Sequence, residues 1–193
     1  MKRLCKSIVI RHQFETEDWF IPDWELKVLL VGTFNPNGGK PVDYFYGRGR
    51  NHMWPIVSHC IGRDLHPNQG AEFFNVIRDL GIGCMDLLRS VSVPQEGEGN
   101  VLGEGYADSN LFKGVNQRTY MTDEILAVID RNPGVCVLPT WGKGSSYLKR
   151  DWQQIVRFPE LPALPSPSPR AGGIEEKKAP WCAQLKRCLG KSR

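Results

Sequence analysis

The chain has little that would place it in a membrane. No apolar run approaches the length of about 20 residues that a membrane-spanning helix needs. The N-terminal stretch MKRLCKSIVIRHQF has a brief apolar run that ends at Arg11, and no small-residue cleavage site follows it, so we expect no secretory signal peptide. The sequence also has no internal repeat and no long low-complexity segment. These absences favour a globular protein with no membrane partner.

The cysteines lack the close pairing of a metal site. Six of them are scattered at positions 5, 60, 84, 136, 182 and 188, and none forms a Cys-x-x-Cys pair, so a zinc site has no local support. Cys60, Cys84 and Cys136 lie in apolar contexts, and we expect them to be buried free thiols. An iron–sulfur cluster that includes Cys182 and Cys188 is the less favoured alternative. Free thiols suit a reducing compartment, which predicts a cytoplasmic protein without a metal or cofactor.

Length and charge set broad limits on fold and partner. A chain of 193 residues fits one domain with a three-layer core. The net charge of +4 permits a nucleic-acid partner without requiring one. Basic residues gather locally at Arg48 and Arg50, at Lys143, at Lys149 and Arg150, and over 177–193. Solvated surface is the simpler interpretation for most of these charges.

Strand and helix patterns alternate along the chain, which favours an α/β fold. Apolar runs predict strands over 25–34, 84–91 and 135–139. Helical periodicity predicts helices over 51–61, 71–80, 122–131 with Thr122 as N-cap, and about 145–157. Residues 94–105 predict a mobile surface loop, the prolines of 159–169 predict a rigid loop, and we expect a basic C-terminal helix within 174–193, with Pro180 near its start. We therefore predict a single domain over 1–193, with a core of about 25–172, built as a three-layer α/β/α sandwich around a mainly parallel sheet.

The stretch from Val28 to Trp54, VLLVGTFNPNGGKPVDYFYGRGRNHMW, is the most informative part of the chain. A buried strand ends in a polar loop over 32–37, an aromatic triplet follows at 44–46, and a helix begins near Asn51. In open α/β sheets, ligands bind at the carboxyl ends of the strands, where this loop would lie. The order suits a pocket that stacks a flat group attached to a phosphate backbone.

Gly32-Thr33-Phe34-Asn35-Pro36, the aromatic Tyr46, the helix start Asn51-His52-Met53-Trp54 and the late Pro/Ser-rich segment over 164–171 together resemble the uracil-DNA glycosylase superfamily. The hypoxanthine-DNA glycosylase-like and mismatch-specific (thymine/uracil) branches look nearest. The resemblance runs from about Val28 to Ala171. Two departures stand out: the first loop has one extra residue before its Asn, and Leu164 stands where the uracil-specific branch has a histidine, which argues against a high-rate uracil enzyme.

Hydrolysis of a base from deoxyribose needs a held water, a neutralised leaving group and a flat pocket for the extruded base. The resemblance implies that Asn51 or Asn35 holds the water. A helix N-cap and an Asx-turn are the structural alternatives for these two residues. Asp43, the only carboxylate of this region, is a secondary catalytic candidate, and a turn residue after Pro41 is the favoured interpretation. His52 is a further candidate for protonating or orienting the leaving group, although a histidine at a helix start is more often structural.

Base and DNA contacts are predicted in the same way. Tyr46 falls where relatives stack an aromatic ring on the flipped base, and Phe34 is a second wall candidate. Asp86 would accept a hydrogen bond from a base edge that donates, or would instead pair with Arg89 or another arginine. Phosphate contacts are expected from the residues of the loops and turns, namely Arg48, Arg50, Lys143, Ser166, Ser168 and Arg170.

The sequence therefore predicts a monofunctional DNA glycosylase that hydrolyses the N-glycosidic bond of a flipped-out base and leaves an abasic site. Hypoxanthine or uracil would imply base-excision DNA repair, and a modified cytosine or uracil of phage DNA would imply antiviral defence. The expected partner is DNA that contains such a base, bound by a monomer. The alternative is a non-catalytic DNA-binding module on the same fold. A nucleotide-binding α/β protein unrelated to DNA is suggested only by the glycine-rich loops.

Overall fold

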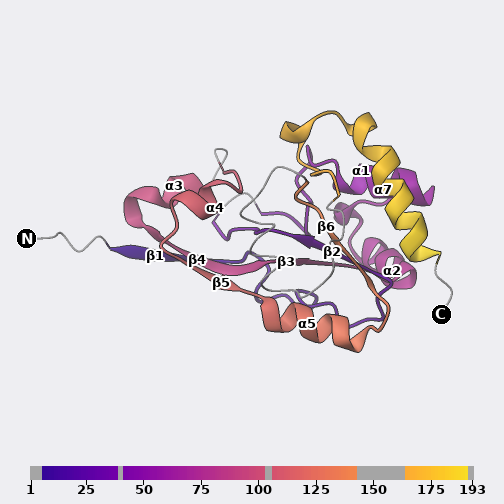
Figure 1. The fold of residues 1–193 in the computed structure, drawn as a ribbon, viewed down its shortest axis with the longest axis horizontal. Coiled ribbons are helices and arrows are strands. Elements are labelled where there is room, and N and C mark those ends of the chain that lie inside the picture. Colours follow the sequence, from indigo (N-terminus) through magenta and orange to yellow (C-terminus); the bar gives the residue numbers. More distant parts are fainter. Residues whose placement is uncertain (1–5, 39–40, 103–105, 143–163, 191–193) are drawn as a thin grey trace, which may run out of the picture.

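The chain folds around two small sheets of different type (Figure 1). The structure is a computed structural model that describes residues 6–38, 41–102, 106–142 and 164–190. Strands β3 (Ile82–Asp86), β2 (Val28–Gly32) and β6 (Cys136–Pro139) form a parallel sheet in that order. Strands β1 (Ser7–Arg11), β4 (Leu88–Pro94) and β5 (Gln117–Tyr120) form an antiparallel sheet. The predicted mixed α/β class is confirmed at this level.

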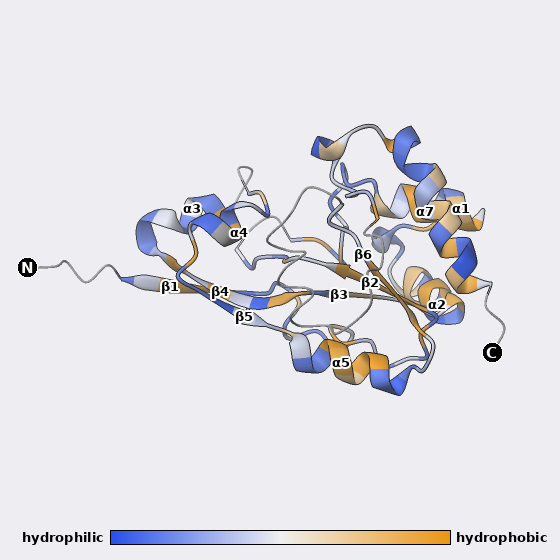
Figure 2. Ribbon diagram, viewed as in Figure 1, coloured by the Kyte–Doolittle hydropathy of each residue, from blue (hydrophilic) through white to orange (hydrophobic). Residues whose placement is uncertain are grey.

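The parallel strands are the centre of the hydrophobic core. Every residue of β2, β3 and β6 is buried, as expected for strands that are covered on both faces. Figure 2 shows them as hydrophobic, whereas α3 (Glu98–Val101) is mainly hydrophilic. The continuous apolar run of the sequence therefore predicted β2 correctly, although the strand is shorter than the expected 25–34.

A break at Leu87 divides the strand predicted over 84–91. The chain leaves the parallel sheet at Asp86 and enters the antiparallel sheet at Leu88. The backbone N–H of Leu87 and of Leu88 donate to the carbonyl oxygens of Gly32 and Thr33, so the chain stays paired while it turns. The single-strand prediction was wrong because the second half pairs with β1 and β5 in a separate antiparallel sheet.

The helices follow the predicted periodicity closely. They are α1 (Met53–Ile61), α2 (Ala71–Leu80) and α5 (Thr122–Arg131), and in Figure 1 α5 lies on the opposite side of the strands from α1. Thr122 is the first helical residue and not the N-cap, which is Met121 without a side-chain bond. The segment predicted as a surface loop contains the 3₁₀ turn Gln95–Gly97 followed by α3, and α4 (Asn110–Lys113) comes soon after. The helix predicted at about 145–157 lies outside the described residues.

The C-terminal helix α7 (Ile174–Leu189) lies within the predicted 174–193, but Pro180 lies inside it and not near its start. It packs along α1 and reaches β2. Its largest buried side chain is Trp181, which is fully covered. Among the described residues, no helix combines the length and the apolar character that a bilayer crossing requires.

Two disulfides connect α7 to the rest of the domain. Cys60 of α1 is bonded to Cys182, and Cys136 of β6 is bonded to Cys188. The prediction of free thiols was therefore wrong for Cys60 and Cys136, because residues far apart in sequence meet on the helix. Cys84 is a buried free thiol, as predicted. Disulfides persist mainly in oxidising compartments, so the cysteines give no support to the expected cytoplasmic location.

Candidate functional site

A cavity of about 900 Å³ opens at the carboxyl edge of the parallel sheet. Gly32 and Asp86 are the last residues of β2 and β3 and lie side by side in register, and Thr140 follows the last residue of β6. All three line the cavity. The site thus lies where parallel α/β sheets bind their ligands.

Position 32 needs a glycine because there is no room for a side chain, and not because of its backbone conformation. A Cβ at this position would stand 2.2 Å from Asp86 Oδ1 and 2.2 Å from the Tyr46 hydroxyl oxygen. Real Cβ atoms do not approach closer than about 3.0 Å. The absence of a side chain lets a carboxylate and a phenol approach the end of the same strand.

Asp86 is almost fully buried and is held through one oxygen. Its Oδ2 accepts hydrogen bonds from His12 Nε2 at 2.9 Å and from Asn35 Nδ2 at 2.7 Å. The tautomer of His12 is fixed, because its Nδ1 accepts from the backbone N–H of Phe14 at 3.1 Å and the proton is then on Nε2. The predicted alternative, an ion pair with Arg89, is wrong: Arg89 pairs with Glu15 and Glu124.

Tyr46 combines an unusual backbone conformation with a fixed hydroxyl. Its φ of 59° is the only positive φ of a non-glycine residue among the described residues. The Thr140 hydroxyl donates to the Val31 carbonyl oxygen at 3.1 Å, so it accepts from the Tyr46 hydroxyl at 2.8 Å. Burial, reinforced by the charge of Asp86, raises the pKa of Tyr46 well above 10. A residue held in this conformation costs of order 1–3 kcal/mol and is typical of functional sites.

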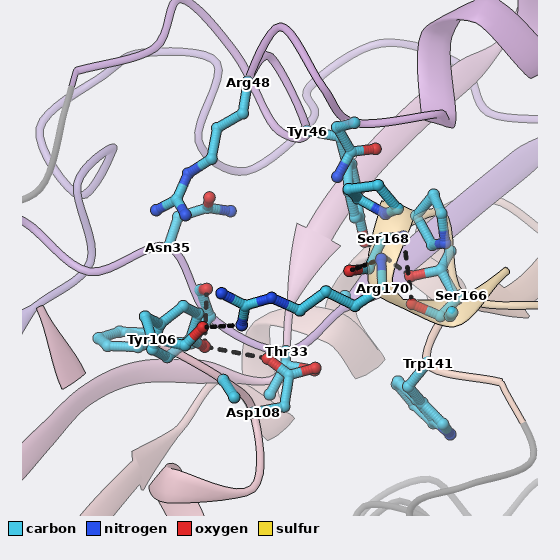
Figure 3. A pocket seen from close by; sticks show the side chains of 18 of the residues that line it. Thr33, Asn35, Tyr46, Arg48, Tyr106, Asp108, Trp141, Ser166, Ser168 and Arg170 are labelled. Atoms are coloured by element: carbon cyan, nitrogen blue, oxygen red, sulfur yellow. Dashed lines mark hydrogen bonds between the residues drawn. The ribbon is translucent and has the colours of Figure 1, made fainter. Parts of the chain in front are cut away.

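A second carboxylate, Asp108, lies in the same cavity and was missed in the sequence. It accepts hydrogen bonds from the Thr33 hydroxyl at 3.1 Å and from the Tyr106 hydroxyl at 3.0 Å (Figure 3). Burial raises the pKa of Asp108, and the charge of Asp86 adds to the effect. Burial and Asp108 likewise raise the pKa of Tyr106 well above 10. The sequence around Asp108 is polar and follows a glycine-rich loop, so no pattern indicated that this side chain faces the cavity.

The Pro/Ser-rich segment over 164–171 forms one rim of the cavity. Its backbone is tightened by bonds from Ser168 N to Ser166 Oγ and from Arg170 N to Ser168 Oγ, each 3.3 Å. The Arg170 side chain extends across the cavity, where its guanidinium donates to the Tyr106 carbonyl oxygen at 2.9 Å (Figure 3). The rim thus brings two serine hydroxyls and a cation to the opening.

Helix α7 holds this rim from behind. Lys177, which is buried, donates to the Ser168 carbonyl oxygen at 2.7 Å and lies 3.2 Å from His52 Nδ1. Trp181 Nε1 donates to the Pro165 carbonyl oxygen at 2.9 Å. Burial lowers the pKa of Lys177, and burial together with the Lys177 charge lowers the pKa of His52. His52 therefore acts as a neutral acceptor in the scaffold of the rim.

The structure brings most of the predicted residues together around the cavity. Ten of them line it: Phe34, Asn35, Tyr46, Arg48, Arg50, Asn51, Asp86, Ser166, Ser168 and Arg170. The exposed Asp43 and the scaffold residue His52 do not. Lys143 lies outside the described residues.

The two asparagines differ in their surroundings. Asn51 Oδ1 accepts from Met53 N at 2.9 Å, a local bond at the helix start, although the N-cap is His52 and not Asn51 as the structural alternative expected. Asn35 instead bonds to Asp86 inside the cavity. The geometry thus favours Asn35 as the amide that takes part in the chemistry.

The mouth of the cavity is cationic. Arg48, Arg50 and Lys113 line it together with Arg170, and the aromatic Trp141 is also in its wall. Within the described ranges, no group of three His, Cys, Asp or Glu side chains is arranged to hold a metal ion. The buried Asp86, the partly buried Asp108, several aromatic rings and a cationic rim thus surround one space.

A comparison of the chain with protein-family models, with curated proteins and with solved structures found no match. The residues and their geometry therefore carry the functional argument.

Proposed function

We propose that the protein is a monofunctional DNA glycosylase of the uracil-DNA glycosylase type, with its three-layer α/β/α architecture. The observation that carries the proposal is the position of Asp86: a buried carboxylate with one oxygen pinned by Asn35, at the end of a parallel strand, in a cavity with a cationic mouth. A glycosylase needs an anion near the sugar, because its transition state places positive charge there.

The aromatic residues support a flat ligand. Phe34, Tyr46, Tyr106 and Trp141 all line the cavity. Stacking of a base on an aromatic ring is worth about 1–3 kcal/mol and helps to offset the cost of extruding the base from the duplex. The cavity is also large enough for a base with a substituent, so both a deaminated base and a modified phage base remain substrates to test.

The basic mouth supports a phosphate backbone. If Arg48, Arg50, Lys113 and Arg170 each neutralise one phosphate, the logarithm of the duplex affinity should fall with the logarithm of the salt concentration with a slope of about −3 to −4. Arg50→Ala should reduce this slope by about one unit. Arg63→Ala is the matched control, because Arg63 is exposed and lies outside the cavity.

The decisive experiment measures base release. The protein is incubated with duplexes that each carry hypoxanthine, uracil or 5-hydroxymethyluracil, and with phage DNA that contains modified cytosine. We expect free base and an alkali-labile abasic site from at least one substrate. Salt-dependent binding without base release from any substrate would instead indicate the non-catalytic DNA-binding module. Absence of both would refute a DNA function.

A further inference from the structure

His12 is the one buried histidine that contacts the site, and it directly follows β1, outside the segment that resembles the glycosylases. Four phenylalanine rings surround it: Phe14, Phe20, Phe34 and Phe45, with ring centroids 4.8–5.8 Å away. A histidine that only filled this apolar space would be a poor choice, since a buried polar group needs partners. Both of its nitrogens are used, and one of them points at Asp86.

The two oxygens of Asp86 have different surroundings. Oδ2 accepts from His12 and from Asn35. Among the described residues, no hydrogen bond is made to Oδ1. This oxygen lies beside Gly32 and the Tyr46 hydroxyl, and Asp86 itself lines the cavity. The two donors therefore hold the carboxylate through Oδ2 alone.

We propose that His12 is a positioning residue that, with Asn35, holds Asp86 through Oδ2 and so aims its Oδ1 at the water that attacks the sugar. This inference rests on the proposed glycosylase function. The Oδ1 anion stabilises the positive charge that develops on the sugar and orients the water. A bond forms between the water oxygen and C1′ while the C1′–N bond breaks, and its electron pair leaves with the base. The water proton goes to Oδ1, and the departing base takes a proton from solvent.

Four other titratable groups interact with Asp86. They are Cys84 on β3, Tyr46 in the first loop, and Tyr106 and Asp108 on the far wall. Burial raises the pKa of Cys84, Tyr46 and Tyr106, so these three groups stay neutral where excision is measured. Asp108 is the group whose titration must be separated, and Asp108→Asn in the parent protein does so.

The test compares two substitutions of His12 in single-turnover base excision over pH 5–9. The substrate is a duplex from which the parent protein releases a base. His12→Phe keeps a ring but removes the donor. We expect excision at pH 7 to fall about ten- to hundredfold, the effect of losing a hydrogen bond to a charged group. The pH below which excision declines should also rise, because a carboxylate that loses a hydrogen-bond donor is protonated more readily. His12→Gln places an amide N–H near the position of Nε2 and should restore most of the rate and the parental pH profile.

Further variants keep the test decisive if His12→Phe does not fold. Asn35→Ala removes the other donor to the same oxygen from a less buried loop and should shift the pH profile in the same direction. Asp86→Asn should lose at least about a hundredfold in rate and retain duplex binding. Asp64→Asn, an exposed carboxylate outside the cavity, is the control and should match the parent.

The outcomes distinguish this inference from the proposed function. A parent that releases no base refutes the function itself. A parent that releases base, with His12 and Asn35 variants that lose only thermal stability and keep the parental pH profile, refutes the positioning role. Full activity of Asp86→Asn refutes the role of the carboxylate.

Discussion

Replacement of Gly32 by alanine is the most direct test of the site geometry. The new Cβ would stand 2.2 Å from Asp86 Oδ1 and from the Tyr46 hydroxyl, about 0.8 Å short of the 3.0 Å that real contacts keep. Neither group is free to retreat, because Asp86 is bonded through Oδ2 at 2.7 and 2.9 Å and Tyr46 is bonded to Thr140 at 2.8 Å. Overpacking of this kind costs about 1–3 kcal/mol.

For a chain of this length, that cost lowers the melting temperature by roughly 2–12 °C. Gly49→Ala is the matched control, since no atom lies within 4 Å of its Cβ position and the unfolded chain is affected equally. Thermal unfolding followed by circular dichroism measures the difference, and single-turnover excision should fall about a hundredfold or more in Gly32→Ala alone. If both alanine variants melt and react as the parent does, the carboxylate and the phenol do not meet at the end of β2.

Four further results are expected. Lys177→Met should increase hydrogen exchange over 164–171, because the Ser168 carbonyl loses its buried donor. Peptide mapping without reductant should recover the Cys60–Cys182 link, and Cys182→Ser should cost about 2–5 kcal/mol of stability, as in other small domains that lose a disulfide; recovery of free Cys182 would contradict the pairing. Because the folded pKa of His52 is lowered from 6.5, the unfolded chain binds more protons below about that pH; stability should then fall as pH drops from 7.5 to 5.5, and less so in His52→Asn. Asn35→Ala should lose more excision rate than Asn51→Ala, since only the first contacts Asp86; equal losses would remove the distinction between them.

Prediction from sequence succeeded where the signal is local. The helix over 71–80 and the buried run of β2 follow from periodicity and apolar composition alone. The helix start near Asn51 was also predicted, although the N-cap is His52 and Asn51 makes only a local bond to Met53 N. The apolar run of β1 was seen but was not predicted as a strand, and the polar sequence Gln-Arg-Thr-Tyr of β5 gave no strand signal.

Contacts between distant segments were beyond reach from sequence. Asp86 was correctly singled out as a carboxylate that needs a partner, but the partner is His12, 74 positions away. Asp108 and Lys177 gained their roles only when the segment after the glycine-rich loop and the C-terminal helix folded against the cavity. The disulfides of α7 were missed for the same reason, since their cysteines are separated by 122 and 52 positions.

The sequence by itself determined the class of elements, the strand that ends at the site, and the group of aromatic, basic and serine residues that now surround one cavity. Tertiary structure alone decided which oxygen of Asp86 is held and which one lies beside Gly32, and that the cysteines pair. The physical reason is that periodicity reports which face of an element is buried, whereas a hydrogen-bond partner or a steric limit at a glycine depends on where another segment arrives in space.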